Sequence, residues 1–341
     1  MTPPELKLSI RTPAPVSALA FGKGNHLVIG ADDGSLRLYN LPETKVYKAV
    51  RGLGSDVSSI AWMHSPGTEI GNIWVAAGQK VILLFGLDTP TMIQDASHSL
   101  VSLNNIIGPD DVFNEIDISA NEKLLAFSCD SGLVGIIDLS TRQVTKMRTL
   151  HTNICGAVRF IPNRPSEILS AGYDSALLHF DITQGSILSR LDIAGIPPSS
   201  GISLSPPFIH SIAFSENGTV AASTADGRVW VGGGGDKLIT PKKKRSRKWE
   251  GLREDEGKWI SVAEGPLVSV DFADSESFLT CTLLGSLSRY NASVGSTETG
   301  IVWSRDVKEL KKANCMQSNR TYIVVGGFSN GGKGLAEVYG A

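Results

Sequence analysis

The sequence lacks long apolar runs, closely paired cysteines and clustered histidines, and each of these absences excludes a class of protein. No stretch of the 341 residues reaches the roughly 18 consecutive apolar residues of a membrane-spanning helix. Residues 1–5 contain neither a basic nor an apolar segment, so we expect no secretory signal. The four cysteines and six histidines are scattered, without the spacing of a zinc site. We therefore expect no membrane attachment, no bound metal and no cofactor.

A phosphate-binding loop is nearly present but incomplete. Residues 327–334 follow an apolar segment and approach the pattern G-x-x-x-x-G-K-[ST]. The last position is Gly334, so the hydroxyl group that would hold magnesium is missing. The residues after it alternate like a strand, whereas a phosphate-binding loop opens a helix. We expect a glycine-rich hairpin turn here.

Basic residues are concentrated in one segment. The formal net charge is −2, yet 6 of the 32 basic residues lie within residues 242–248. Without this segment the chain has 26 basic and 34 acidic residues, a net charge of −8. This distribution argues against a nucleic-acid-binding surface that is basic throughout.

The sequence is rich in a repeated unit. A short alternating apolar stretch closes on a large residue, and a second apolar stretch, a tight Asp-Gly-type turn and a third stretch follow it. The closing residues are Phe21, Trp62, Ile118, Phe160, Phe214 and Phe272. They are 41, 56, 42, 54 and 58 residues apart, where a bare four-stranded unit needs about 40. This period predicts an all-β, WD40-type β-propeller.

The spacing also predicts the number of blades and the closure of the ring. The longer steps indicate insertions near residues 88–113, 191–208 and 232–257, and a seventh, degenerate unit fits at the C-terminal end with strands at 314–318, 321–325 and 334–339. Its fourth strand can come from the alternating residues 6–10, which would remove two open sheet edges. We predict one seven-bladed propeller domain over residues 1–341, with a flexible basic insertion at 232–257 in the fifth blade.

One repeat keeps most of the polar pattern of a WD repeat. The positions that usually hold His, Ser or Thr, Asp and Trp hold His151, Ser170, Asp174 and Phe180. Because Phe180 has no N–H group to donate, we expect a structural hydrogen-bond chain running His151–Asp174–Ser170. The same residue types form catalytic triads, but a serine on the second strand of a blade lies away from any cleft or oxyanion donor. We therefore expect no catalytic site.

The basic segment resembles a monopartite nuclear localisation signal, an extended strand that acidic pockets on an importin bind. It follows the glycines at 232–235, and its dense charge favours a solvated loop. Contact with nucleic-acid phosphates and a loop without a partner are the alternatives, and no lipidation site or apolar anchor beside it favours a membrane. The six candidate residues are Lys242, Lys243, Lys244, Arg245, Arg247 and Lys248.

About a quarter of the chain carries motifs more specific than a generic WD unit. They include His-Thr-Asn-Ile-Cys at 151–155, Phe-Ile-Pro-Asn-Arg-Pro at 160–165, Asp-Ser-Gly at 130–132 and His-Ser-Ile at 210–212. In these motifs the chain resembles the WD repeat-containing protein 53 family. The resemblance implies a non-enzymatic propeller among the candidate substrate receptors that dock on the DDB1 adaptor of cullin-4 ubiquitin ligases.

That docking commonly uses a W-D-x-R tetrapeptide, and no intact copy occurs in this sequence. The nearest segments are residues 137–142, which lack the Trp and place the Arg too far from the Asp, and residues 303–306, which lack the Asp. We expect a non-enzymatic, monomeric, nuclear or nucleo-cytoplasmic scaffold that binds protein partners, and the sharpest hypothesis is a substrate receptor of a DDB1–cullin-4 ligase. The alternatives are a chaperone or assembly factor for a basic nuclear or ribosomal client, and a nucleic-acid-associated nuclear protein.

Overall fold

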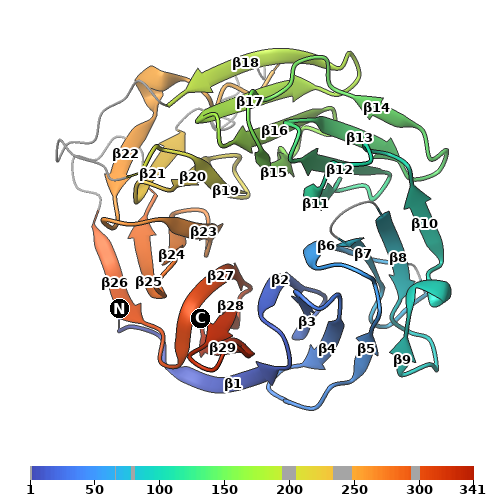
Figure 1. Ribbon diagram of the computed structural model, residues 1–341. Helices are drawn as coiled ribbons and strands as arrows, with labels where there is room; N and C mark the ends of the chain where they lie inside the picture. The colour runs from blue at the N-terminus through green and yellow to red at the C-terminus, as the bar shows by residue number, and fades with distance from the viewer. Residues whose placement is uncertain (1, 66, 78–80, 194–204, 233–247, 293–299) are drawn as a thin grey trace.

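Seven sheets, antiparallel except for one short parallel pair, surround a central opening (Figure 1). The computed structural model describes residues 2–65, 67–77, 81–193, 205–232, 248–292 and 300–341. The regular structure in these residues is β apart from two 3-10 turns, η1 (Ala96–His98) and η2 (Glu254–Glu256). No helix among them has the length and apolar character needed to cross a bilayer. The predicted all-β class and the seven blades are confirmed.

Blades 1 to 4 follow one another along the chain, and the first strand of each is innermost (Figure 1). Blade 1 contains β2 (Val16–Phe21), β3 (His26–Ala31), β4 (Leu36–Asn40) and β5 (Lys48–Val50), and blade 2 contains β6 (Val57–Met63), β7 (Asn72–Ala77), β8 (Val81–Gly86) and β10 (Val101–Asn104). Blade 3 contains β11 (Phe113–Ile118), β12 (Leu124–Cys129), β13 (Val134–Asp138) and β14 (Val144–Lys146), and blade 4 contains β15 (Cys155–Phe160), β16 (Glu167–Gly172), β17 (Ala176–Asp181) and β18 (Ser186–Asp192).

The last three blades complete the ring. Blade 5 contains β19 (Ile209–Phe214), β20 (Val220–Thr224), β21 (Arg228–Gly232) and β22 (Lys258–Ser261), and blade 6 contains β23 (Leu267–Phe272), β24 (Ser277–Thr282), β25 (Ser286–Asn291) and β26 (Ile301–Asp306). Blade 7 contains β27 (Leu310–Ser318), β28 (Tyr322–Ser329), β29 (Gly334–Gly340) and the N-terminal β1 (Leu6–Thr12).

The two ends of the chain share blade 7. Strand β1 pairs antiparallel with β29, with Ile10 opposite Ala336 and Thr12 opposite Gly334. This pairing gives each strand a partner that it would otherwise lack at an open edge. The predicted closure of the ring by the N-terminal strand is therefore confirmed, and the predicted hairpin turn before Gly334 joins β28 to β29.

Two elements differ from the sequence-based expectation. Strand β27 begins at Leu310, four residues before the predicted start. Two register irregularities interrupt its alternation, so the sequence pattern did not reveal its first residues. The insertion after β8 contributes β9 (Ile93–Gln94), which pairs parallel with β5 and adds a fifth strand to blade 1. A two-residue parallel pairing has no periodic signature, so the sequence could not predict it.

The hydrophobic core lies between blades rather than within one central mass. Seven clusters of buried side chains each combine residues of two neighbouring blades. The cluster between blades 7 and 1, for example, packs Ile10 and Val338 against Leu27 and Tyr39. Burial of a large apolar side chain contributes about 1.5–3 kcal/mol, so each blade depends on both neighbours for its stability.

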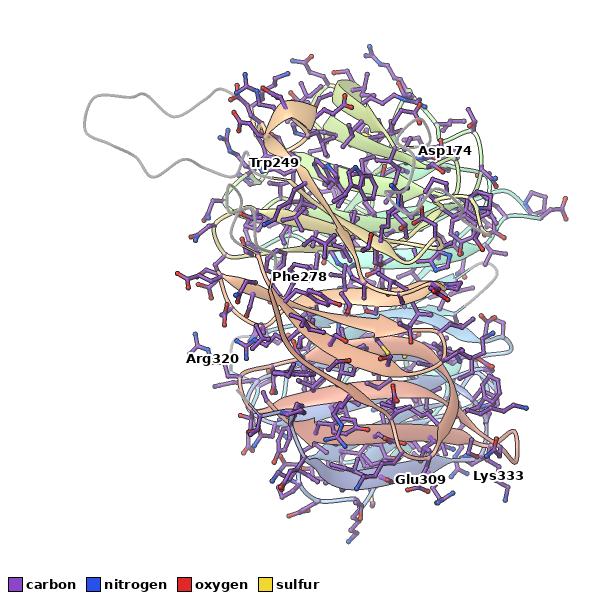
Figure 2. All side chains as sticks on the ribbon, turned by 90° about the vertical axis from the view of Figure 1, so that its left-hand side faces the viewer. Asp174, Trp249, Phe278, Glu309, Arg320 and Lys333 are labelled. Atoms are coloured by element: carbon purple, nitrogen blue, oxygen red, sulfur yellow. The ribbon has the colours of Figure 1, made fainter. Side chains whose placement is uncertain are left out.

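The turns between second and third strands lie on one face of the ring, which we call the mouth face. Figure 2 shows Asp174 and Lys333, which belong to two of these turns, toward one side of the ring and Arg320 toward the other. A left-handed backbone closes these turns, as at Gly132, where φ is +80° and an added Cβ would lie 2.2 Å from the carbonyl oxygen of His151. In blade 4 Ser175 adopts this conformation, with φ of +60°.

Candidate functional site

The inner strands carry a bulge where the channel opens on the mouth face. In each of the seven strands the pairing with the second strand skips a residue, which leaves that residue unpaired and turns its side chain; β27 skips two, Lys311 and Asn314. One skipped residue of each strand lines the central channel, and we call these seven residues the mouth ring. Its members are Ser17, Ser58, Asn114, Gly156, His210, Val268 and Asn314.

Four members of the mouth ring hydrogen-bond to the next blade. Each reaches the backbone carbonyl of the residue that precedes the neighbouring ring member, and this repeated contact ties adjacent inner strands together. The bonds run from Ser17 to Val57 (2.7 Å), from Asn114 to Cys155 (3.1 Å), from His210 to Leu267 (3.1 Å) and from Asn314 to Val16 (2.9 Å).

The boundary between blades 4 and 5 is different. Its ring member is Gly156, which has no side chain, whereas Ser59 and Ser269 supply the bonds at two other boundaries. Among the described residues, no side-chain hydrogen bond joins β15 to β19. An aromatic cluster stands here instead: the ring of Tyr173 stacks on Phe208 with centroids 5.5 Å apart, and it lies 5.4 Å from the ring of His210.

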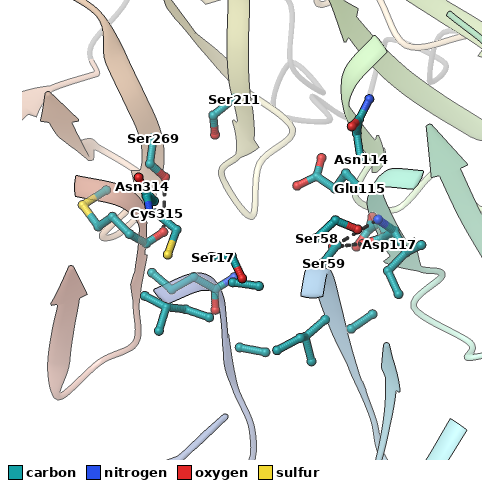
Figure 3. Close-up of a pocket in the computed structure, with 18 of the residues that line it drawn as sticks. Ser17, Ser58, Ser59, Asn114, Glu115, Asp117, Ser211, Ser269, Asn314 and Cys315 are labelled. Atoms are coloured by element: carbon teal, nitrogen blue, oxygen red, sulfur yellow. Dashed lines mark hydrogen bonds between the residues drawn. The ribbon is translucent and has the colours of Figure 1, made fainter. Parts of the chain in front are cut away.

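The channel below the ring has a volume of about 400 Å³ and a polar wall (Figure 3). The guanidinium of Arg159 lies 2.5 Å from Glu115, whose other oxygen accepts the backbone N–H of Val158 at 2.8 Å. Asp117 accepts the N–H of Phe160 at 2.7 Å. Burial raises the pKa of both Glu115 and Asp117, and Arg159 opposes the rise. These three side chains form one polar cluster on the channel wall.

The structure brings the three residues of the expected hydrogen-bond chain together in blade 4. Nδ1 of His151 lies 2.9 Å from Asp174 Oδ1, and Nε2 lies 2.8 Å from Ser170 Oγ. His151 therefore stands between the two partners, whereas the expected order placed Asp174 in the middle. Burial alone would raise the pKa of Asp174, but the hydrogen bond with His151 and neighbouring N–H groups hold it below its usual range.

This arrangement does not have the access that a nucleophile needs. Ser170 is completely buried and Asp174 is 4% exposed, so a substrate carbonyl cannot approach the hydroxyl. In the described part of the chain, no group of three His, Cys, Asp or Glu side chains is placed to hold a metal ion. The chain of hydrogen bonds instead links the turn of blade 4 to its second strand.

The basic segment lies largely outside the residues that the structure describes. Of its six candidate residues only Lys248 is described, and it is exposed, with Nζ 3.3 Å from the carbonyl oxygen of Leu188. Figure 2 shows its neighbour Trp249 toward the side of the ring away from Asp174. The C-terminal end of the insertion therefore returns to the ring opposite the mouth face.

Trp249 anchors that return between blades 4 and 5. Its side chain is 2% exposed, and its indole N–H donates to the carbonyl of Gly218 at 2.9 Å. Its backbone N–H donates to Glu167 at 2.8 Å, and the same carboxylate lies 2.7 Å from Nε2 of His179. This cluster was not predicted from the sequence, although a lone Trp between a basic and an acidic segment could have indicated an anchor.

Comparison with known proteins agrees with the fold. No protein-family model matches the chain. The chain is similar to the WD repeat-containing protein 53 homolog of Dictyostelium discoideum, with 24% identity over 221 residues. The match covers 59% of this chain and 57% of that protein, so it spans little more than half of the relative's length. The chain is a seven-bladed β-propeller that is similar to the WD repeat-containing protein 53 homolog.

Proposed function

We propose that this propeller is an interaction scaffold that binds protein partners at its channel mouth. The observation that carries the proposal is the mouth ring, where seven bulged residues surround an open polar channel. Hydrogen bonds between blades hold these positions in place, and a preorganised surface loses little conformational entropy on binding. Binding residues are typically carried by loops and positions that a rigid scaffold holds in place.

The charge of the body favours a partner with basic groups. Outside residues 242–248 the chain has a net charge of −8, and the channel wall presents Glu115 and Asp117 beside a single Arg159. Opposite charges accelerate encounter and exclude wrong partners more than they add affinity. This supports the role of a chaperone or assembly factor for a basic client.

The sharper hypothesis is a substrate receptor of a DDB1–cullin-4 ubiquitin ligase, and its support is the similarity to WD repeat-containing protein 53. The adaptor-docking arginine must then come from an imperfect motif. Arg305 lies over the ring of Tyr339, 4.7 Å from its centroid, and donates to the carbonyl of Pro4, so it is used within the chain. Arg142 is exposed, so its side chain is accessible to an adaptor.

Affinity purification of the full chain followed by mass spectrometry separates the two roles. Recovery of cullin-4 with its adaptor, lost in Arg142→Ala and retained in the matched surface variant Arg148→Ala, supports the ligase receptor. Recovery of one basic histone or ribosomal protein without either ligase component supports the chaperone. Enrichment of nucleic acid that persists at physiological salt would contradict both and favour a nucleic-acid-associated protein.

We also propose that residues 242–248 direct import into the nucleus. The support is the density of positive charge in the segment and the anchored Trp249 that follows it, which returns the chain to the ring opposite the mouth. A reporter fused to residues 236–257 should accumulate in the nucleus, and the same fusion with the six basic residues changed to Ala should not. Cytoplasmic retention of the unchanged fusion would contradict the proposal.

A further inference from the structure

The channel mouth has one place where acidic, aromatic and hydrogen-bond-accepting groups converge. It lies at the boundary of blades 4 and 5, where Gly156 has no side chain, whereas four other members of the mouth ring bond to the next blade. An added Cβ on Gly156 would lie 3.2 Å from the ring of Tyr173, so the glycine makes room for this ring at the mouth. Phe208 supports Tyr173 from behind through a stacked contact, with ring planes 10° apart.

His210 contributes an acceptor nitrogen to this place. Its Nδ1 lies 3.1 Å from the carbonyl oxygen of Leu267, and because a carbonyl can only accept, Nδ1 carries the proton. Burial lowers the pKa of His210, although the same hydrogen bond opposes the shift, so the imidazole is neutral near pH 7. Nε2 then carries a lone pair and has no partner among the described residues, and His210 lines the channel.

Asp130 contributes the negative charge. Asn114 donates both to Asp130 at 3.0 Å and to the carbonyl of Cys155 at 3.1 Å, so the carboxylate lies near the residue that precedes Gly156. Burial raises the pKa of Tyr173, and the charge of Asp130 adds to this rise. One oxygen of Asp130 accepts from Asn114 of the mouth ring at 3.0 Å, and the other has no partner in the described part of the chain. Asp130 is exposed, and Asn114, which binds its carboxylate, lines the channel.

We propose that Asp130, Tyr173 and His210 form a binding site for an arginine side chain of a partner protein. A guanidinium offers five N–H donors in one plane, which suit the free oxygen of Asp130 and Nε2 of His210, and its face can lie on an aromatic ring. An ammonium group has no plane and cannot use both acceptors and the ring equally well. The nearby Arg159 does not oppose this charge, because Glu115 neutralises it.

The inference rests on the proposed scaffold function, because it names the chemistry by which the mouth holds a partner. A test with a small molecule keeps the two apart. Full-length protein labelled with 3-fluorotyrosine is titrated with N-acetyl-arginine amide, and the Tyr173 resonance is identified by its loss in Tyr173→Phe. The isosteric neutral control is N-acetyl-citrulline amide, and N-acetyl-lysine amide tests the preference for a guanidinium.

We expect a saturable shift of the Tyr173 resonance with arginine amide, and a dissociation constant at least fivefold weaker with lysine or citrulline amide. Asp130→Asn should weaken arginine binding about tenfold. Asp32→Asn, which changes an exposed aspartate at the equivalent turn position of blade 1, should leave it unchanged. The site would be overturned by any of three results: no saturable shift with arginine amide, an equal shift with citrulline amide, or unchanged arginine binding in Asp130→Asn. Equal binding of lysine amide would overturn the guanidinium assignment. The scaffold function is tested separately, by the partners recovered in affinity purification, so the arginine site can fail while the scaffold function stands.

Discussion

The replacement of Trp249 by Ala tests whether the return of the basic insertion holds blades 4 and 5 together. The inner strands of these blades share no side-chain hydrogen bond among the described residues, so the boundary depends on apolar packing, to which Trp249 contributes from the side opposite the mouth. Truncation of a buried Trp costs about 3–5 kcal/mol. With an unfolding entropy of about 2.1 cal/mol/K per residue, that loss lowers the melting temperature of a chain of this length by about 4–7 °C.

The assay combines thermal melts with hydrogen exchange. Exchange should accelerate first in peptides that contain β18 and β19, because the boundary between blades 4 and 5 opens before the rest of the ring. Trp249→Phe keeps the ring contacts with His179 and Phe214 but loses the indole N–H bond to Gly218, so we expect a smaller loss of about 1 kcal/mol or more.

A matched control is available in the same blade. Trp259 is partly exposed and packs beneath Arg228, whose guanidinium lies 4.3 Å from the centroid of its ring. Its replacement by Ala should lower the melting temperature by less than half as much as Trp249→Ala. If Trp249→Ala costs no more than Trp259→Ala, or if exchange rises evenly in all blades, the reasoning about this boundary is refuted.

Three further predictions concern the hydrogen-bond chain of blade 4. Ser170→Ala leaves Nε2 of His151 buried without a partner and should lower the free energy of unfolding by about 1–3 kcal/mol in denaturant titration, whereas an unchanged stability would contradict a structural role. Gly132→Ala places a Cβ against the carbonyl of His151 in a left-handed turn, so we expect a loss of at least about 1–2 kcal/mol, larger than that of an alanine substitution at an exposed glycine without close neighbours such as Gly52. Asp174 has a lowered pKa in the folded state, so its contribution to the free energy of unfolding is present above about pH 3.8 and disappears as the pH falls through the folded pKa. The difference in melting temperature between wild type and Asp174→Asn should therefore shrink in acid. A constant difference would contradict the assignment.

The repeat rhythm was sufficient to predict the inner strands and the ring. Phe21, Phe160, Phe214 and Phe272 each end the first strand of a blade, because alternation of apolar residues and a following turn are local properties of the sequence. The closing strand was predictable for the same reason, since residues 6–10 alternate and had no other partner. The early start of β27 was missed because Lys311 and Lys312 break the apolar pattern at its beginning.

The candidate site was less accessible to sequence reasoning, because it depends on contacts between blades. The mouth ring consists of residues as different as Ser17, Gly156 and Val268, which share only their position at a bulge. Nothing in the sequence near Trp249 indicates that its backbone N–H reaches Glu167, 82 residues away. The residues of the His151 chain were predictable because a WD repeat has a recognisable polar pattern, but their order required the observed distances.

The most direct test of the account compares the partners of two variants with those of the wild-type protein by quantitative affinity purification. Val268→Arg places a long side chain in the mouth ring at a position that makes no bond between blades, and Arg320→Glu changes an exposed residue on the opposite face. Both variants should retain the melting temperature of the wild type within a few degrees. We predict that Val268→Arg loses the specific partners while Arg320→Glu keeps them; retention of every partner by Val268→Arg would contradict the assignment of the mouth as the binding surface.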